Sequence, residues 1–512
     1  MNGPSTLLRG GRVLVGAEPE PRPAELLLRD GHIAAIAPPG AGNHRQVDEI
    51  IELDGRVVLP GFVDGHCHLE LTAVALELQL PLHAPPYESI AQMLAALGRA
   101  RAAQPLGWIV ARSSFGLQNK VAEGRLPHRV ELDQVSPGQP MAVLAGLHVA
   151  CLNSAAITAL GLDDSARLPG WISQHHDANG PTGAFTEVWD RLPTAGVDDV
   201  VAALRAHAVP VFSRSGVTSL STIPTSADDV RALHRLAKAS ELPFRVRFYP
   251  HVPRTATLDE VLAWGPESGF GDEWLRFGGV KIFVDGEGAD AMGNRRDDTK
   301  WTQRELYEFV RRADAAGIQV MMHAVTPGAV RFACEAALRA RQVNGGARPV
   351  RHRVEHAGDY MDPADAGLAT RAAVGLVATP HFATSSDPDA PDFQPLRTLI
   401  DAGHRIIGAT DCTGTVPEAA GPLVNIAAAV GRVGPDGRPS PHRISVLEGI
   451  RMFSRWSALG AAEEHEKGTI APGMRADLVV LDDDPFSVPP DRIAGISVDR
   501  TIVAGVTVSG AA

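Results

Sequence analysis

Cysteine is scarce in this sequence: there are four among 512 residues, far apart and without CxxC spacing. This pattern argues against a disulfide framework and indicates reduced thiols in a cytosolic protein. The chain also lacks an apolar run long enough to cross a bilayer. Its first residues show no basic patch followed by an apolar stretch, so we expect no signal peptide and a cytoplasmic location.

Long runs of one charge are also missing. The 48 basic and 60 acidic residues give a formal net charge of −12, which is spread along the chain without clusters. Such a balance argues against nucleic acid or an anionic membrane surface as the main partner. We expect a small-molecule substrate instead, and the sequence leaves open whether the chain forms a homo-oligomer. The length and the 44% hydrophobic content suffice for a large core and a further domain.

A His-Cys-His stretch at residues 66–68 is the feature around which the chain is organised. It follows an apolar, β-branched run, which is typical of a buried strand that ends in a polar site. Side chains two residues apart on a strand point the same way, so His66 and His68 would aim two imidazoles at one point. Two convergent imidazoles suit a divalent metal such as zinc, although a packed or solvated histidine pair would also fit these two residues alone.

The two ends of the chain predict short strands with tight turns. Residues 7–59 contain hairpin-like stretches, one of them with Asp30-Gly31 between two apolar runs, and residues 468–508 resume the pattern. Because chain termini commonly lie close together, we expect residues 1–59 and 458–512 to form one small β-sandwich domain.

Between these ends, strand and helix patterns alternate, which is typical of a parallel sheet with crossover helices. After the strand that leads to His66 there are seven more candidate strands, at residues 216–220, 244–249, 279–285, 318–323, 352–356, 375–381 and 405–411. Eight such units predict an α/β fold with a (β/α)8 TIM-like barrel over residues 60–457. Residues 70–215 are too long for one crossover, so we expect them to contain an inserted α+β subdomain beside or over the barrel mouth.

Polar side chains fall on the predicted strands at or near the ends. The carboxyl ends of barrel strands converge on one mouth, where active sites are built, so these side chains should meet. The residues are His66, His68, Lys281, His323, His356 and Asp411. Taken singly, each has a structural alternative: a hydrogen-bonded filler for a histidine, a helix N-cap for Asp411, and a pairing with Asp285 for Lys281. Their joint occurrence favours a site for one or two divalent metal ions.

Lys281 lies among apolar neighbours in the predicted strand at residues 279–285. Burial disfavours the ammonium form, so the pKa of this lysine should fall. A neutral amine can react with CO₂ to give an anionic carbamate, which can bridge two metal ions. N-carboxylation would therefore turn Lys281 into a ligand.

Residues 60–68 resemble the first-strand motif of the metal-dependent amidohydrolase superfamily, and the chain is similar over nearly its whole length to the YtcJ-like group, or amidohydrolase family 3. Six further stretches carry the resemblance: residues 147–154, 181–187, 279–286, 316–324, 353–357 and 468–482. The resemblance implies a hydrolase that acts on an amide or related carbon–nitrogen bond other than a peptide bond.

Two stretches depart from the pattern of that group. After the fifth strand the group often has an acid four residues beyond the histidine, whereas this chain has Pro327 there. The second strand often ends in His-Asp, and here it ends in Ser221-Thr222. Neither departure removes a proposed metal ligand, but both bear on the substrate.

The hypothesis that follows is metal-assisted hydrolysis, with zinc as the default ion and iron or manganese as alternatives. Asp411 would accept the proton of the attacking water and return it to the leaving nitrogen. His148 and His381 are candidates to contact the substrate; for both, a loop histidine at the surface is an equal alternative.

Other functions fit parts of the same pattern. Deamination, ester or carbamate cleavage, and isomerisation are related chemistries for the same barrel. A non-catalytic scaffold should lack several ligands, yet this chain has them all. A binding module whose insertion at residues 70–215 recruits a protein is disfavoured, because that stretch is neither strongly charged nor repetitive.

Overall fold

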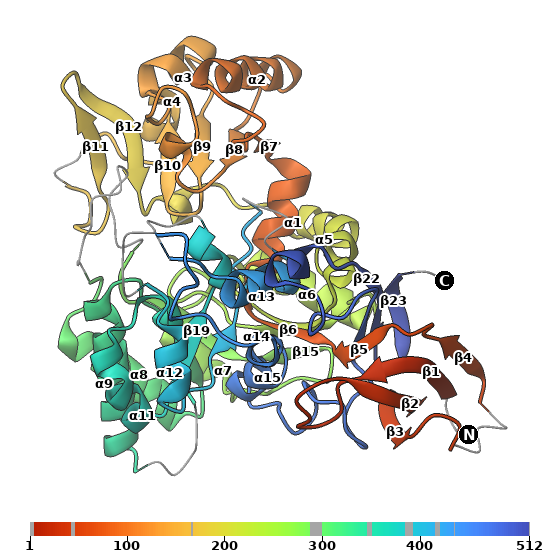
Figure 1. Ribbon diagram of the computed structural model, residues 1–512. Coiled ribbons are helices and arrows are strands. Elements are labelled where there is room, and N and C mark those ends of the chain that lie inside the picture. Colours follow the sequence, from red (N-terminus) through yellow and green to blue (C-terminus); the bar gives the residue numbers. More distant parts are fainter. Residues whose placement is uncertain are drawn as a thin grey trace.

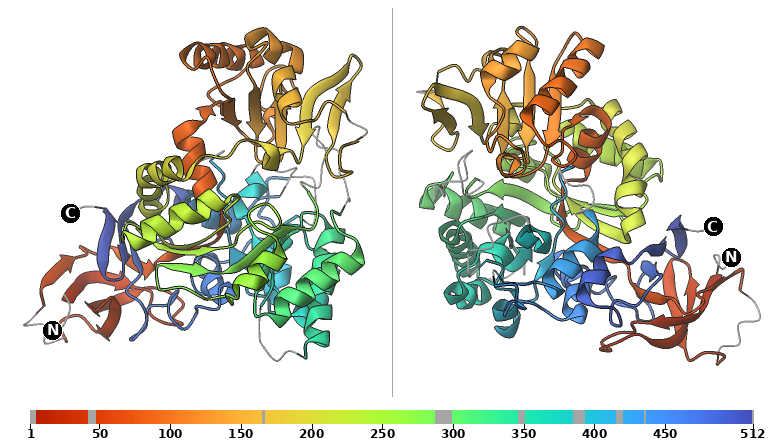
Figure 2. Two further views of the ribbon diagram at one scale, coloured as in Figure 1. Left: turned by 180° about the vertical axis from the view of Figure 1, so that it is seen from behind. Right: turned by 45° about the horizontal axis from the view of Figure 1, so that its top comes forward.

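The computed structural model describes residues 5–41, 47–164, 167–286, 299–345, 351–384, 393–414, 420–434 and 436–510. This part of the chain has a mixed α/β fold, in which strands from the two ends, a parallel central region and an inserted unit occupy different places (Figures 1 and 2). No helix in these ranges is both long and apolar enough to cross a membrane.

One sheet joins the two ends of the chain, which lie on the same side of the molecule (Figure 1). Its order is β23-β22-β21-β5-β1-β2-β3, with β4 beside β1. The strands are β1 (Ser5–Val13), β2 (Arg22–Arg29), β3 (His32–Ala37), β4 (Glu49–Glu52), β5 (Val57–Pro60), β21 (Leu478–Leu481), β22 (Val498–Val503) and β23 (Val506–Gly510). The antiparallel pairing of β21 with β5 makes the junction, and apolar residues of both ends share one core.

The central region consists of parallel strands in two sheets, ordered β15-β14-β13-β6 and β16-β17-β18-β19-β20. The strands are β6 (Phe62–Cys67), β13 (Val217–Thr222), β14 (Arg245–Phe248), β15 (Leu275–Phe277), β16 (Gly279–Phe283), β17 (Gln319–His323), β18 (Arg353–Glu355), β19 (Gly375–Ala378) and β20 (Ile407–Gly408). All seven strands that the sequence predicts after the first one are confirmed, with shifted ends.

Contacts at both junctions connect these two sheets. At one junction only Gly278 separates β15 from β16, and the Lys281 N–H of β16 donates to the Pro250 carbonyl, just after β14, at 3.1 Å. At the other junction β20 lies against β6, where the Asp411 N–H donates to the His66 carbonyl at 2.9 Å. The carboxyl ends of the parallel strands therefore face one region.

Helices follow most of the parallel strands and cover them from outside (Figure 2). They are α1 (Leu69–Leu78), α5 (Val197–Val211), α6 (Ala227–Lys238), α7 (Leu258–Trp264), α8 (Gln303–Ala315), α9 (Pro327–Val343), α10 (Ala357–Tyr360), α11 (Ala366–Ala372), α12 (Leu396–Asp401), α13 (Pro422–Val430), α14 (Val446–Met452) and α15 (Arg455–Gly460). Ser226, Thr257 and Thr302 begin α6, α7 and α8 with capping boxes, which satisfy free N–H groups of the first turn.

The inserted unit lies at the top of Figure 1 and has its own mixed sheet, ordered β11-β12-β10-β9-β8-β7. Its elements are β7 (Leu80–Pro81), α2 (Ile90–Ala103), β8 (Ile109–Ser113), α3 (Arg129–Val135), β9 (Met141–Ala145), β10 (Val149–Leu152), α4 (Ser154–Ala159), β11 (Gln174–Asp177) and β12 (Gly180–Thr186). The unit buries two apolar clusters of its own, so it packs as a separate layer above the parallel strands.

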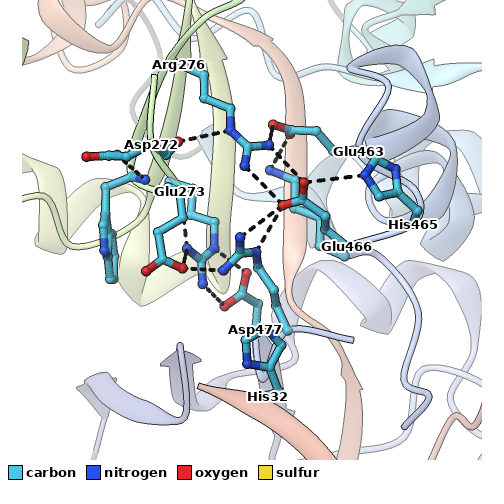
Figure 3. Close-up of polar contacts among 12 residues, drawn as sticks. His32, Asp272, Glu273, Arg276, Glu463, His465, Glu466 and Asp477 are labelled. Carbon is cyan, nitrogen blue, oxygen red and sulfur yellow. Dashed lines mark hydrogen bonds and ion pairs between the residues drawn. The ribbon is translucent and has the colours of Figure 1, made fainter. Parts of the chain in front are cut away.

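An ion-pair network ties the chain-end sheet to the parallel strands (Figure 3). Arg245 on β14 donates to both oxygens of Asp477, at 2.8 and 3.0 Å, and both side chains are buried. Arg276 on β15 contacts Glu463 at 2.8 Å and Glu466 at 3.2 Å. Because these acids precede β21, the network fixes where the last strands lie relative to the parallel strands.

We expect Asp477→Asn to destabilise the protein by about 3 kcal/mol, because it leaves the buried Arg245 guanidinium without its bidentate partner. Unfolding in urea measures the change. The control is Glu241→Gln, which breaks the exposed Arg205–Glu241 pair and should hardly alter unfolding. Equal unfolding midpoints for the two variants would show that the network contributes nothing to stability.

Candidate metal centre

His66 and His68 stand at the end of β6, and the local fold leaves them little freedom. Both side chains are buried, with 1% and 3% of their surface exposed. Gly65 permits the close approach of β20, since a Cβ atom there would lie 2.3 Å from Ile407 and 2.7 Å from the Gly408 carbonyl oxygen. His68 is also the N-cap residue of α1, so it lies between a strand and a helix that are both packed.

Asp411 follows β20 and faces these two histidines. Its Oδ1 lies 3.5 Å from Nε2 of His66 and 3.4 Å from Nε2 of His68. Asp64 anchors the preceding turn, because its carboxylate accepts from the Thr410 N–H at 3.0 Å and from the Thr410 hydroxyl at 2.5 Å. Asp411 itself has a φ of +47°, a left-handed conformation that the anchored turn maintains.

The three side chains fit a divalent metal ion. One ligand atom from each of His66, His68 and Asp411 lies within 4.8 Å of the others. Nε2 of His66 is buried and has no hydrogen-bond partner among the described residues, as expected for a nitrogen that serves a metal. Two imidazoles and a carboxylate are ligands that zinc and similar ions accept.

The protonation states also suit metal binding. Burial lowers the pKa of His66 to about 3, so its imidazole is neutral. Burial alone would raise the pKa of Asp411, but His66, His68 and His356 hold it well below its usual value. A neutral imidazole and an ionised carboxylate are the forms that bind metals.

Glu355 orients His66, a role that its position in the sequence does not reveal. Its Oε2 lies 2.6 Å from Nδ1 of His66, which leaves Nε2 directed at Asp411. Arg353 donates to both Glu355 oxygens, at 3.0 and 2.9 Å, and to the Gly65 carbonyl at 2.6 Å. Burial opposes ionisation of Glu355, but Arg353 and then His66 lower its pKa to about 2. The sequence did contain a signal that these side chains have a role: Arg353 and Glu355 are two charged residues within a strand that is predicted to be buried, just before His356.

His356 lies beside the three-residue group, and His323 lies beyond it. The His356 ring is 5.4 Å from the His66 ring, and its Nε2 is 4.0 Å from Oδ2 of Asp411. The His323 ring is 4.8 Å from that of His356, while its Nε2 lies 3.0 Å from the Gly286 carbonyl oxygen. The structure therefore brings all four imidazoles into one cluster, with His323 in contact with the loop after β16.

Lys281 is buried on β16, with 1% of its surface exposed. Burial lowers its pKa to about 8, although Glu355 and Asp411 act in the opposite direction. The alternative pairing with Asp285 is not among the ion pairs of the described residues. Asp285 instead accepts hydrogen bonds from the N–H groups of Val325 and Thr326, and so fixes the loop after β17.

The two candidate substrate contacts, His148 and His381, come from different parts of the chain. His148, from the inserted unit, has its ring 5.5 Å from that of His323 and its Nδ1 2.8 Å from Oε1 of Glu187. Its side chain is mostly buried, so it is not a surface loop histidine. His381 follows β19, and its Nδ1 lies 3.1 Å from Oδ1 of Asn425.

The departure at the end of β13 has a structural explanation. The Thr222 hydroxyl donates to Oε2 of Glu70 at 2.5 Å and accepts from the Leu69 N–H at 3.0 Å. Thr222 thereby holds the first turn of α1, whose N-cap residue is His68. Ser221-Thr222 could be recognised in the sequence as a departure from the family pattern, but the spacing of residues does not reveal that Thr222 contacts Glu70.

We expect Glu355→Gln to weaken metal affinity about 10- to 100-fold. The amide would donate to Nδ1 of His66, which forces the proton onto Nε2, where the metal should bind. Competition with a chelator measures the affinity of folded protein, and Glu335→Gln on α9 serves as the matched control. Equal affinities in the two variants would disprove the orienting role.

Comparisons with known proteins identify the family and agree with the fold. The chain is 27% identical over 550 residues to N-substituted formamide deformylase of Arthrobacter pascens, covering 98% of this chain and 94% of the relative. It is 26% identical over 546 residues to the putative amidohydrolase YtcJ of Bacillus subtilis, covering 97% and 98%.

A solved structure of an uncharacterized metal-dependent hydrolase from Pyrococcus furiosus shares the fold, with a TM-score of 0.68, 23% identity, and coverage of 94% of this chain and all of that one. The family profile matches residues 49–509. The resemblance noted in the sequence is thus confirmed, and the chain belongs to the amidohydrolase family.

Proposed function

We propose that this protein is a metal-dependent hydrolase that cleaves an amide, formamide or related non-peptide C–N bond of a small molecule. The observation that carries the proposal is the convergence of the buried His66 and His68 on Asp411, with an unpartnered nitrogen of His66 aimed at the carboxylate. The similarity to a formamide deformylase supports the bond type.

The proposed scaffold is a (β/α)8 barrel over residues 60–457. The parallel order of its strands, the near-continuity of β15 and β16, and the contact between β20 and β6 support closure. We assign residues 1–59 and 458–512 to a β-sandwich domain, supported by their common sheet. The inserted subdomain lies within residues 70–215. Three further statements stay predictions: that the partner is a small molecule, that neither nucleic acid nor a membrane is a partner, and that the protein is cytoplasmic.

One or two divalent ions, zinc by default, are proposed for the centre. His66, His68 and Asp411 would hold the first ion, and His323 and His356 the second, with Lys281 between them if it is carboxylated. When bound, such an ion supplies Lewis-acid chemistry that activates water and polarises a carbonyl. Lys281 suits carboxylation because burial keeps much of its amine neutral near pH 8.

Asp411 is the proposed general base. Its carboxylate stays ionised beside three histidines, so it can accept a proton from the attacking water and pass it to the leaving nitrogen. We propose that His148, beside His323, and His381, which follows β19, contact the carbonyl or the leaving group. Glu355 keeps His66 in the tautomer that leaves Nε2 free.

Hydrolysis of a panel of formamides, other acyl amines, carbamates, esters and aminated rings tests the proposal. We expect turnover of a formamide or acyl amine that is lost on chelation and restored by metal. Asp411→Asn should reduce kcat by about 100-fold or more, since general-base catalysis contributes about 10²–10⁴-fold. Turnover of aminated rings alone would indicate a deaminase, and near-normal turnover in the Asn variant would contradict the base assignment.

The pKa of Lys281 predicts a pH dependence for its carboxylation. Below pH 8 the amine is mostly protonated and cannot react with CO₂; above pH 8 it is neutral. At constant dissolved ¹³CO₂ and with metal added, the ¹³C carbamate signal should therefore rise between pH 7 and 9. Lys281→Met should remove the signal, whereas Lys238→Met on α6 should keep it. An unchanged signal in the Lys281 variant would disprove the assignment.

A further inference from the structure

His251 lies at the same edge of the parallel strands as the candidate metal centre. The chain continues past β14 and pairs with β16: the Lys281 N–H donates to the Pro250 carbonyl at 3.1 Å, and the Val252 N–H donates to the Lys281 carbonyl at 2.8 Å. His251 and Lys281 are direct partners in this parallel bridge. Paired residues of neighbouring strands project to one face of a sheet, so the His251 imidazole shares the face of the Lys281 side chain.

The His251 ring is held between two aromatic side chains from different units. Trp189 of the inserted unit lies 5.4 Å from it, with the rings tilted by 32°, and Phe283 of β16 meets it edge-on at 5.1 Å. Phe283 also lies 4.5 Å from His323 and 5.9 Å from His148. The His251 ring therefore belongs to an aromatic wall that runs from the inserted unit to the proposed metal ligands.

Nδ1 of His251 is buried and lacks a hydrogen-bond partner among the described residues, while only 7% of the residue is exposed. A buried polar atom without a partner is costly, so such atoms in native proteins call for an explanation. Packing between Trp189 and Phe283 explains why a ring stands at this position, but a phenylalanine ring would pack there equally well. The nitrogen needs another role.

The charges around His251 favour one kind of partner. The cationic side chains of Arg254 and Lys300 both act on this imidazole electrostatically. Positive surroundings favour a ligand atom with negative partial charge, such as a carbonyl or carboxylate oxygen. Imidazole can donate from Nδ1 to such an oxygen when the proton resides there.

We propose that His251 is a substrate-binding residue, whose Nδ1 donates a hydrogen bond to an acceptor oxygen of the substrate outside the scissile bond. The substrate class would then be acyl amines that carry a second carbonyl or carboxylate. The inference rests on the proposed hydrolase function and adds to it a determinant of specificity at the end of the third parallel strand.

Binding of hydroxamates to the metal-loaded protein tests the inference without turnover. Acetohydroxamate can reach only the metal, whereas hippuric hydroxamate carries an additional amide carbonyl beyond the chelating group. Calorimetry would compare the wild type with His251→Phe, which keeps the ring, and His251→Asn, which keeps a polar nitrogen near Nδ1. The control is His234→Phe on α6, whose exposed imidazole lies outside the site.

We expect His251→Phe to weaken hippuric hydroxamate about tenfold or more, as for a hydrogen bond left unmade. His251→Asn should recover most of this loss, and acetohydroxamate should bind all variants alike. Unchanged affinity of hippuric hydroxamate in His251→Phe would overturn the inference. So would an equal loss for both probes, which would mean that His251 acts only through the metal centre.

The wild type distinguishes this inference from the proposed function. If the metal-loaded wild type binds neither probe, the hydrolase proposal fails, and the role of His251 falls with it. If the wild type binds acetohydroxamate, and binds hippuric hydroxamate with equal or lower affinity, the metal centre is supported and the role of His251 is refuted.

Discussion

The hydrogen bond between Glu355 and His66 is the interaction on which the site depends. It joins Oε2 of Glu355 on β18 to Nδ1 of His66 on β6 at 2.6 Å, and Arg353 donates to the same carboxylate. Because Glu355 takes Nδ1, the other nitrogen of His66 is directed at Asp411 and away from bulk water. Without Glu355, either ring nitrogen of His66 could face the Asp411 carboxylate. The fully buried Arg353–Glu355 pair fixes Nε2 as the nitrogen that does.

The inserted unit completes the site. His148 and Trp189 both come from it, and each contacts Phe283 at the end of β16. Glu187 joins the two parts, since it lies 2.8 Å from Nδ1 of His148 and accepts from Lys300 at 2.8 Å. The proposed metal ligands are thus carried by strand ends, whereas the insertion supplies His148 and Trp189 beside Phe283. This division explains how one scaffold can keep its chemistry while its substrates change.

Much of this arrangement could be predicted from sequence. Parallel strands appear as short apolar runs followed by polar residues, so the strands that bear His66, His323 and His356 could be located, and a common mouth follows from their direction. Contacts between distant strands could not be predicted, because no periodicity indicates that Glu355 meets His66 or that Thr222 meets Glu70. His251 escaped notice for another reason: the strand pattern stops at Tyr249, and only backbone pairing with Lys281 reveals that the chain continues along the sheet.

The central claim is that buried, neutral imidazoles and an ionised Asp411 form a metal centre. Its most direct test is the metal content per chain, by elemental analysis of protein purified without chelator or nickel affinity. We expect about one or two equivalents of a divalent metal, with about two supporting the second site at His323, His356 and carboxylated Lys281. Protein that is purified metal-free, and that neither binds nor is activated by added zinc, iron or manganese, would contradict the account.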